Sequence, residues 1–136
     1  MKSFNMFIVL FSLFLFACNE RTNQVQFSEV QISDLGNYKM KILPDILMSG
    51  YDVKLIIYDD CKYNKLNKVE RNGSTIDIEK QFNSMIMAPC MLTNDTIPIG
   101  KLPAGTYRVN YTLVDLSTVT KNKTPFAIAF KIVVTN

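Results

Sequence analysis

The stretch Tyr107-Arg108-Val109-Asn110-Tyr111-Thr112-Leu113 decides the fold, because apolar side chains occupy every odd position in it and polar side chains every even one. Successive side chains of a β-strand point to opposite faces of the sheet, so this alternation predicts a strand that is half buried against a core. The same period of two recurs in residues 38–42, 53–57, 76–79 and 126–132, and no stretch has a convincing helical period. The pattern predicts an all-β domain over residues 25–136, an antiparallel sandwich of about seven to nine strands.

One of the turns between these segments has a specific signature. Asn72-Gly73 is a dipeptide that favours type I′ turns, in which both central residues have positive φ. The sequence therefore predicts a tight β-hairpin at these two residues.

A second short motif narrows the sandwich class. Leu102-Pro103-Ala104-Gly105-Thr106-Tyr107-Arg108-Val109 resembles the L-x-x-G-x-Y-x-V stretch that opens a late strand in many immunoglobulin-like and transthyretin-like domains. The resemblance implies an immunoglobulin-like sandwich and says nothing of function. It also implies that Tyr107 forms a tyrosine corner, in which the hydroxyl bonds back to upstream backbone.

The N-terminal residues have the features of a targeting signal. Lys2 gives a positive start, and residues 6–17 form an apolar run that ends at Cys18. A membrane-spanning helix needs about 20 apolar residues, which this run does not supply. A positive start with a short apolar core is typical of a secretory signal peptide.

The end of that run carries a more specific motif. Leu15-Phe16-Ala17-Cys18 resembles the lipobox of bacterial lipoproteins, in which a small residue precedes an invariant cysteine. The resemblance implies that residues 1–17 are removed, that Cys18 is lipidated with palmitate among its acyl chains, and that residues 18–24 form a tether. Because Asn19 is not the aspartate that retains many lipoproteins in the inner membrane, an outer-membrane location is favoured, on either its periplasmic or its surface face. The alternative is an ordinary secretory signal with a chance cysteine.

Composition excludes several classes of function. The chain has 15 Lys and Arg residues against 12 Asp and Glu residues, a formal net charge of +3, which is too small and too dispersed to favour nucleic-acid binding. It contains no histidine, so histidine-dependent nucleophilic triads and the usual zinc and non-haem iron sites are ruled out. We therefore expect no catalytic residue, no cofactor and no enzymatic activity.

Two cysteines remain once Cys18 is lipidated. Cys61 and Cys90 would then lie in an oxidising compartment, where disulfides persist. The sequence favours a bond between them, and the alternative is two buried free thiols.

A cluster of soft sulfur donors follows in the chain. Met85, Met87, Cys90 and Met91 are the ligand types that select Cu(I), so a copper carrier is one hypothesis. The alternative is that the methionines fill gaps in the core. A disulfide at Cys90 would also remove one donor.

The densest basic run contains Lys62, Lys65, Lys68 and Arg71. These residues are the candidate partner-binding positions, for an acidic protein or for lipid phosphates. The alternative is that they coat a loop or protect an edge strand from pairing.

Two shorter motifs are less informative. Asp59-Asp60 is a carboxylate pair, but adjacent strand residues point to opposite faces, so we expect no shared site there. Asp95-Thr96-Ile97 resembles a short motif for periplasmic O-glycosylation in one large Gram-negative phylum, which makes Thr96 a candidate glycosylation site. A three-residue motif also arises by chance.

The sequence thus favours a lipid-anchored module of the bacterial cell envelope that binds or has a structural role without catalysis. Its partner would be an envelope protein or a surface polymer, and an inhibitor or accessory subunit is a specific version of this role. The competing hypothesis is the soft-metal carrier.

Overall fold

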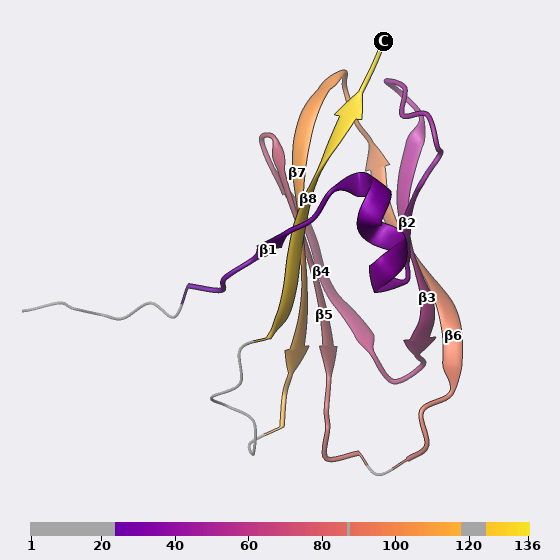
Figure 1. Ribbon diagram of the computed structural model, residues 1–136, viewed down its shortest axis with the longest axis vertical. Helices are drawn as coiled ribbons and strands as arrows, with labels where there is room; N and C mark the ends of the chain where they lie inside the picture. Colours follow the sequence, from indigo (N-terminus) through magenta and orange to yellow (C-terminus); the bar gives the residue numbers. More distant parts are fainter. Residues whose placement is uncertain (1–23, 87, 118–124) are drawn as a thin grey trace, which may run out of the picture.

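The computed structural model describes residues 24–86, 88–117 and 125–136, which form two packed β-sheets and one short helix (Figure 1). The five-stranded sheet has the order β1-β8-β7-β5-β4, and the three-stranded sheet has the order β2-β3-β6. The predicted all-β sandwich class and the number of strands are confirmed. The elements are β1 (Ser28–Glu29), η2 (Ile32–Tyr38), β2 (Met40–Leu43), β3 (Asp52–Cys61), β4 (Lys65–Asn72), β5 (Thr75–Phe82), β6 (Leu92–Lys101), β7 (Gly105–Asp115) and β8 (Phe126–Val134).

The pairing is mostly but not wholly antiparallel. β1 runs parallel to β8, and β5 runs parallel to β7. The second case follows from the path of the chain, which leaves β5, passes through β6 in the other sheet and returns beside β5 as β7. A parallel neighbour requires such a crossover connection. The architecture is a two-sheet β-sandwich, and the finer immunoglobulin-like assignment stays a prediction.

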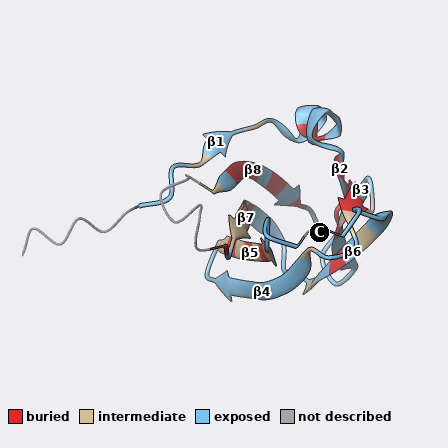
Figure 2. Cartoon of the chain, turned by 90° about the horizontal axis from the view of Figure 1, so that it is seen from below, coloured by how far each residue is buried: buried red, intermediate tan, exposed pale blue. Residues whose placement is uncertain are grey.

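The core lies between the two sheets, as the alternation in β7 predicts. Tyr107, Val109 and Tyr111 are buried, whereas Arg108 and Asn110 lie on the outer face. There the Asn110 side-chain amide donates to Asp77 Oδ1 at 2.8 Å and its Oδ1 accepts from Arg108 Nε at 2.9 Å. β4, by contrast, is exposed along its whole length at the outer edge of its sheet (Figure 2).

The predicted hairpin joins β4 to β5, but its loop is shifted by one residue. Asn72 pairs with Thr75, so the two loop residues are Gly73 and Ser74. Gly73 has a φ of 60°, and Ser74 is not among the described residues with positive φ. A two-residue loop that needs positive φ only at its first position is the type II′ geometry, which places glycine there.

One short helix was not predicted. Residues 32–38 form the 3₁₀ helix η2, which ends at Lys39 in the left-handed conformation. Tyr38, which the alternation assigned to a strand, is its last residue. A helix of seven residues with Leu35 as its buried residue leaves no helical period in the sequence. Among the described residues, no helix is long and apolar enough to cross a membrane.

Candidate functional site

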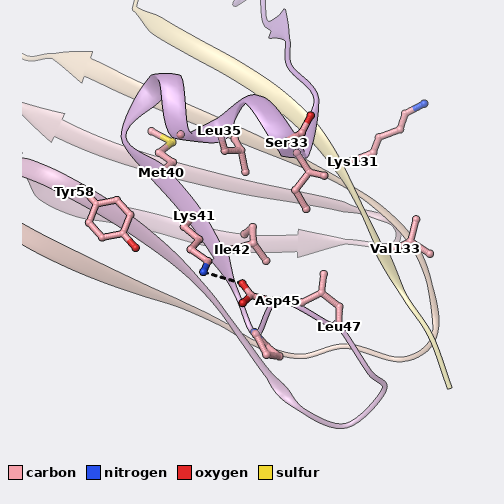
Figure 3. Close-up of a pocket in the computed structure, with 13 residues that line it drawn as sticks. Ser33, Leu35, Met40, Lys41, Ile42, Asp45, Leu47, Tyr58, Lys131 and Val133 are labelled. Carbon is pink, nitrogen blue, oxygen red and sulfur yellow. Dashed lines mark ion pairs between the residues drawn. The ribbon is translucent and has the colours of Figure 1, made fainter.

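A concave surface lies between η2, β2 and the C-terminal half of β8 (Figure 3). We call it the β2–β8 groove; its volume is about 620 Å³. Four buried apolar side chains line its floor, namely Leu35, Met40, Ile42 and Leu47. Ile32 and Val133 are exposed at its rim, Val133 by 60%. The groove therefore offers an apolar surface with access from solvent.

The edge of β8 borders one side of this groove. β1 covers that edge only as far as Ala129, and the Val30 N–H donates to the Ala129 carbonyl at 2.8 Å. The next backbone contact along the edge joins Thr135 to Leu47 at 2.9 Å. Alternate residues of a strand direct their N–H and C=O groups to alternate edges, so Lys131 and Val133 face the same way as Ala129 and Thr135. No strand in the described part of the chain pairs with them there.

β2 borders the other side and is the outer strand of its own sheet. The Lys39 carbonyl accepts from the Tyr58 N–H of β3 at 2.7 Å, which places the backbone groups of Lys39 and Lys41 toward β3. Those of Met40 and Ile42 consequently point to the free edge. Within the described residues, two strand edges that pair with no further strand thus flank one apolar floor.

The charged side chains that line the groove are either paired with each other or directed away from it. Lys41 forms an ion pair with Asp45 at 2.8 Å, and this hydrogen-bonded carboxylate raises the pKa of Lys41. The amino group of Lys131 points away from the other labelled side chains (Figure 3). Recognition in the groove would rest on apolar contact and backbone hydrogen bonds.

A second feature lies in the core between the ends of β3, β5 and β6. Lys80 is only 1% exposed, and its ammonium forms ion pairs with Asp60 and with Asp95, the latter at 2.5 Å. Asp60 is 8% exposed and Asp95 38%. Lysine is almost never fully buried unless it is paired. We call these three residues the Lys80 cluster.

A β-bulge brings Asp60 into this cluster. Val53, Leu55 and Ile57 face the core, so regular alternation would turn Asp59 inward and Asp60 outward. The register shifts after Ile57, and Asp59 takes a φ of 51°. The extra residue reverses the phase, as bulges do. We expected no shared site for Asp59 and Asp60, and these two side chains do point apart. Asp60 instead meets Asp95 at Lys80, a pair that the sequence did not single out.

The surroundings of the Lys80 cluster are largely desolvated. Burial and the charges of Asp60 and Asp95 raise the pKa of the Tyr111 phenol, so that hydroxyl stays neutral. The second oxygen of Asp60 accepts a hydrogen bond from the Asn64 side-chain amide at 2.7 Å. Each buried side-chain polar atom in the described residues has a hydrogen-bond partner.

The cysteine pair lies next to the same cluster. Cys61 ends β3 and forms a disulfide with Cys90, with the two Cα atoms 5.4 Å apart. This is the pairing that the sequence favours. It occupies the thiolate that the copper hypothesis requires.

The other proposed sulfur ligands do not form a closed site in the described residues. Met85 and Met91 are more than half exposed, so neither fills the core. Met87 lies outside the described residues. Where the structure describes the chain, no group of three or more Cys, Asp or Glu side chains could hold a metal ion.

The basic run does not form one face. Lys65, Lys68 and Arg71 lie on the edge strand β4, and Lys62 lies in the turn before it. Lys68 forms an ion pair with Glu70, which lowers the pKa of Glu70. Arg71 lies opposite Ile76 and stacks over the Tyr107 ring at 5.2 Å. The positions fit the edge-strand alternative, and partner binding by them stays a prediction.

Of the other predicted site residues, Tyr107 lies on β7 and Thr96 on β6. The Tyr107 hydroxyl donates to the Pro103 carbonyl at 2.9 Å, the contact expected of a tyrosine corner. Thr96 is exposed on β6, while Asp95 of the same motif is engaged with Lys80. Cys18 and its lipobox lie outside the described residues.

Comparison with known protein families, with curated proteins and with solved structures finds no match to this chain. The sequence motifs and the geometry of the described residues are therefore the basis for the functional proposal.

Proposed function

We propose that the chain is a lipid-anchored, non-catalytic binding module of the bacterial cell envelope, and that the β2–β8 groove takes an extended peptide segment of another envelope protein. The observation that carries the proposal is the position of the apolar floor between two strand edges to which the described part of the chain adds no further strand. An extended peptide satisfies the backbone groups of such an edge by adding a strand, while its alternate side chains fill the floor.

The chemistry of the groove favours this occupant over a charged polymer. Its floor is formed by Leu35, Met40, Ile42 and Leu47, and its lysine beside β2 is already paired with Asp45. A chain segment with apolar residues at alternate positions matches both the floor and the edge of β8. The module would serve as an inhibitor or accessory subunit of the protein that it binds.

The anchor rests on the sequence motif at Cys18 and places the module in the envelope, with the outer membrane favoured. Two or more acyl chains hold a protein stably on a bilayer, whereas one holds it only marginally. Attachment would raise the effective concentration of the groove for neighbouring envelope proteins. Changing Cys18→Ser should abolish lipid labelling and release the protein from the membrane fraction. Continued labelling and sedimentation with membranes would contradict the anchor.

The edge of β8 offers a specific test of the groove. Val133→Pro deletes a backbone N–H that faces the free edge, so it should leave the β7–β8 ladder intact and change the melting temperature little. Ile132→Pro deletes an N–H that bonds to β7 and should destabilise the fold. In-cell crosslinking should then recover the same envelope partner with the parent chain and lose it with folded Val133→Pro. An unchanged yield from that variant would contradict binding by strand addition.

The noncatalytic assignment is supported by composition. Without histidine the chain lacks the commonest general base. In the Lys80 cluster, Lys80 and Asp60 are buried, and the ammonium is held between two carboxylates.

A further inference from the structure

The side chains of the Lys80 cluster connect the two sheets across the core. Lys80 belongs to β5 of the five-stranded sheet, whereas Asp60 and Asp95 belong to β3 and β6 of the three-stranded sheet. The Lys80 Nζ contacts one oxygen of each carboxylate. An amine and two carboxyl groups are therefore held in contact inside a protein core.

Burial makes the charged form of this arrangement costly. Moving an ammonium and a carboxylate out of water has a desolvation penalty that their mutual attraction often fails to offset. A neutral amide that keeps hydrogen bonds carries a much smaller penalty. Condensation of the two groups would remove both charges and release one water molecule.

We propose that Lys80 and Asp60 condense spontaneously to form an intramolecular isopeptide bond between Nζ of Lys80 and Cγ of Asp60, with Asp95 as the proton-transfer group. In this reaction a proton leaves the ammonium, and the amine lone pair attacks Cγ. The Nζ–Cγ bond forms, one Cγ–O bond of Asp60 breaks, and the departing oxygen leaves as water with two protons. No oxidant, reductant or second substrate is needed.

The surroundings of Asp60 suit it to be the electrophile. It is the more deeply buried carboxyl, and its other oxygen accepts the Asn64 amide N–H at 2.7 Å. That donor stabilises the negative charge that develops on the oxygen when Nζ attacks. Asn64 lies in the turn that follows β3, and this turn brings its side-chain amide to Asp60 near the end of that strand.

Asp95 suits the proton-transfer role. Asp95 lies on β6, the neighbour of β3, and contacts Nζ at 2.5 Å. Its side chain is 38% exposed, so it reaches both the amine and solvent. It can accept a proton from Nζ and deliver one to the departing oxygen, as a positioned carboxylate does in general acid–base catalysis.

Proximity and exclusion of water supply the driving force. Groups held in a reactive geometry reach effective molarities of about 10⁵–10⁸ M. Beside them, the raised pKa of the Tyr111 phenol reflects the desolvation of this end of the core. Water is consequently scarce at the point where hydrolysis would reverse the bond.

Peptide mapping of the full-length protein tests the bond directly. After denaturation, reduction, alkylation and trypsin digestion, the bond should join peptide 55–62, which contains Asp60, to peptide 72–101, in which cleavage after Lys80 is blocked. The linked pair should be lighter than its two parts by one water molecule. The Lys41–Asp45 ion pair is the control: it is exposed to solvent, so these two side chains should not condense, and trypsin should cleave normally after Lys41.

Two variants identify the roles of the residues. Lys80→Arg should yield no linked pair, because the guanidinium is a poor nucleophile, and Asp95→Asn should lower the linked fraction severely while leaving Asp60 and Lys80 in place. Free peptides 72–80 and 81–101 from the parent protein would overturn the proposal. Peptide 72–101 lighter by one water but not linked to 55–62 would place the bond on Asp95 and overturn the role of Asp60.

Discussion

The side chains of Lys80 and Asp60 meet in the core although they lie on opposite sheets. This contact lies beside the Cys61–Cys90 disulfide, so the Lys80–Asp60 contact and the disulfide together connect one end of the sandwich. The β2–β8 groove lies elsewhere, at the free edges of β2 and β8. The chain thus separates the features that hold the fold together from the surface that we propose for binding.

Lys80→Met should destabilise the protein by about 3–5 kcal/mol, because the variant can form neither an amide nor an ion pair with Asp60, and the Asp60 carboxylate stays buried without a partner cation. Urea denaturation measures the loss. Lys65→Met on the exposed strand β4 is the matched control and should change stability by less than about 0.5 kcal/mol. Adding Asp60→Leu to Lys80→Met should recover part of the loss, since the uncompensated charge is then removed. A midpoint for Lys80→Met equal to that of the parent would show that the cluster contributes nothing.

Tyr107→Phe should lower the free energy of unfolding by about 1–3 kcal/mol, because the Pro103 carbonyl loses its donor. Tyr51→Phe is the control, since Tyr51 is 59% exposed. Chemical denaturation of the two variants checks the difference. If both variants unfold at the same denaturant concentration as the parent, Tyr107 is not a stabilising corner.

Reduction of Cys61–Cys90 should lower stability by roughly 3–4 kcal/mol in the chain-entropy account, and the melting temperature by several degrees. The bond joins residues 29 positions apart, so it lowers the conformational entropy of the unfolded chain by this amount. Peptide mapping without reduction checks the pairing itself. Recovery of both cysteines in alkylated form would contradict it.

The alternation in residues 107–113 and in the segments that repeat it predicted the sandwich, because burial on one face leaves a period of two in the sequence. Lys80 and Asp95 could have been found in the same way. Lys80 continues the buried positions Ile76 and Ile78, and Asp95 precedes the buried Ile97 by two residues. A charged residue in phase with buried neighbours is a signal for a paired ion in the core.

Asp60 and the groove could not have been predicted. Asp60 reaches the cluster only because the β-bulge at Asp59 reverses the alternation of β3. The local sequence pattern contains no signal for this bulge. The groove depends on how β2 and β8, far apart in the sequence, lie across from each other beneath η2 (Figure 3). Such an arrangement follows from the packing of the two sheets, which no single segment encodes.

Photo-crosslinking in intact cells tests the central claim, that the β2–β8 groove binds an extended segment of an envelope protein. A photoreactive phenylalanine replaces Val133 at the groove rim and, as the control, Lys54 on the exposed face of β3. The account predicts one specific adduct from position 133, mapped by mass spectrometry to a segment with apolar residues at alternate positions, and no such adduct from position 54. The absence of an adduct at position 133, or the same adducts from both positions, would contradict it.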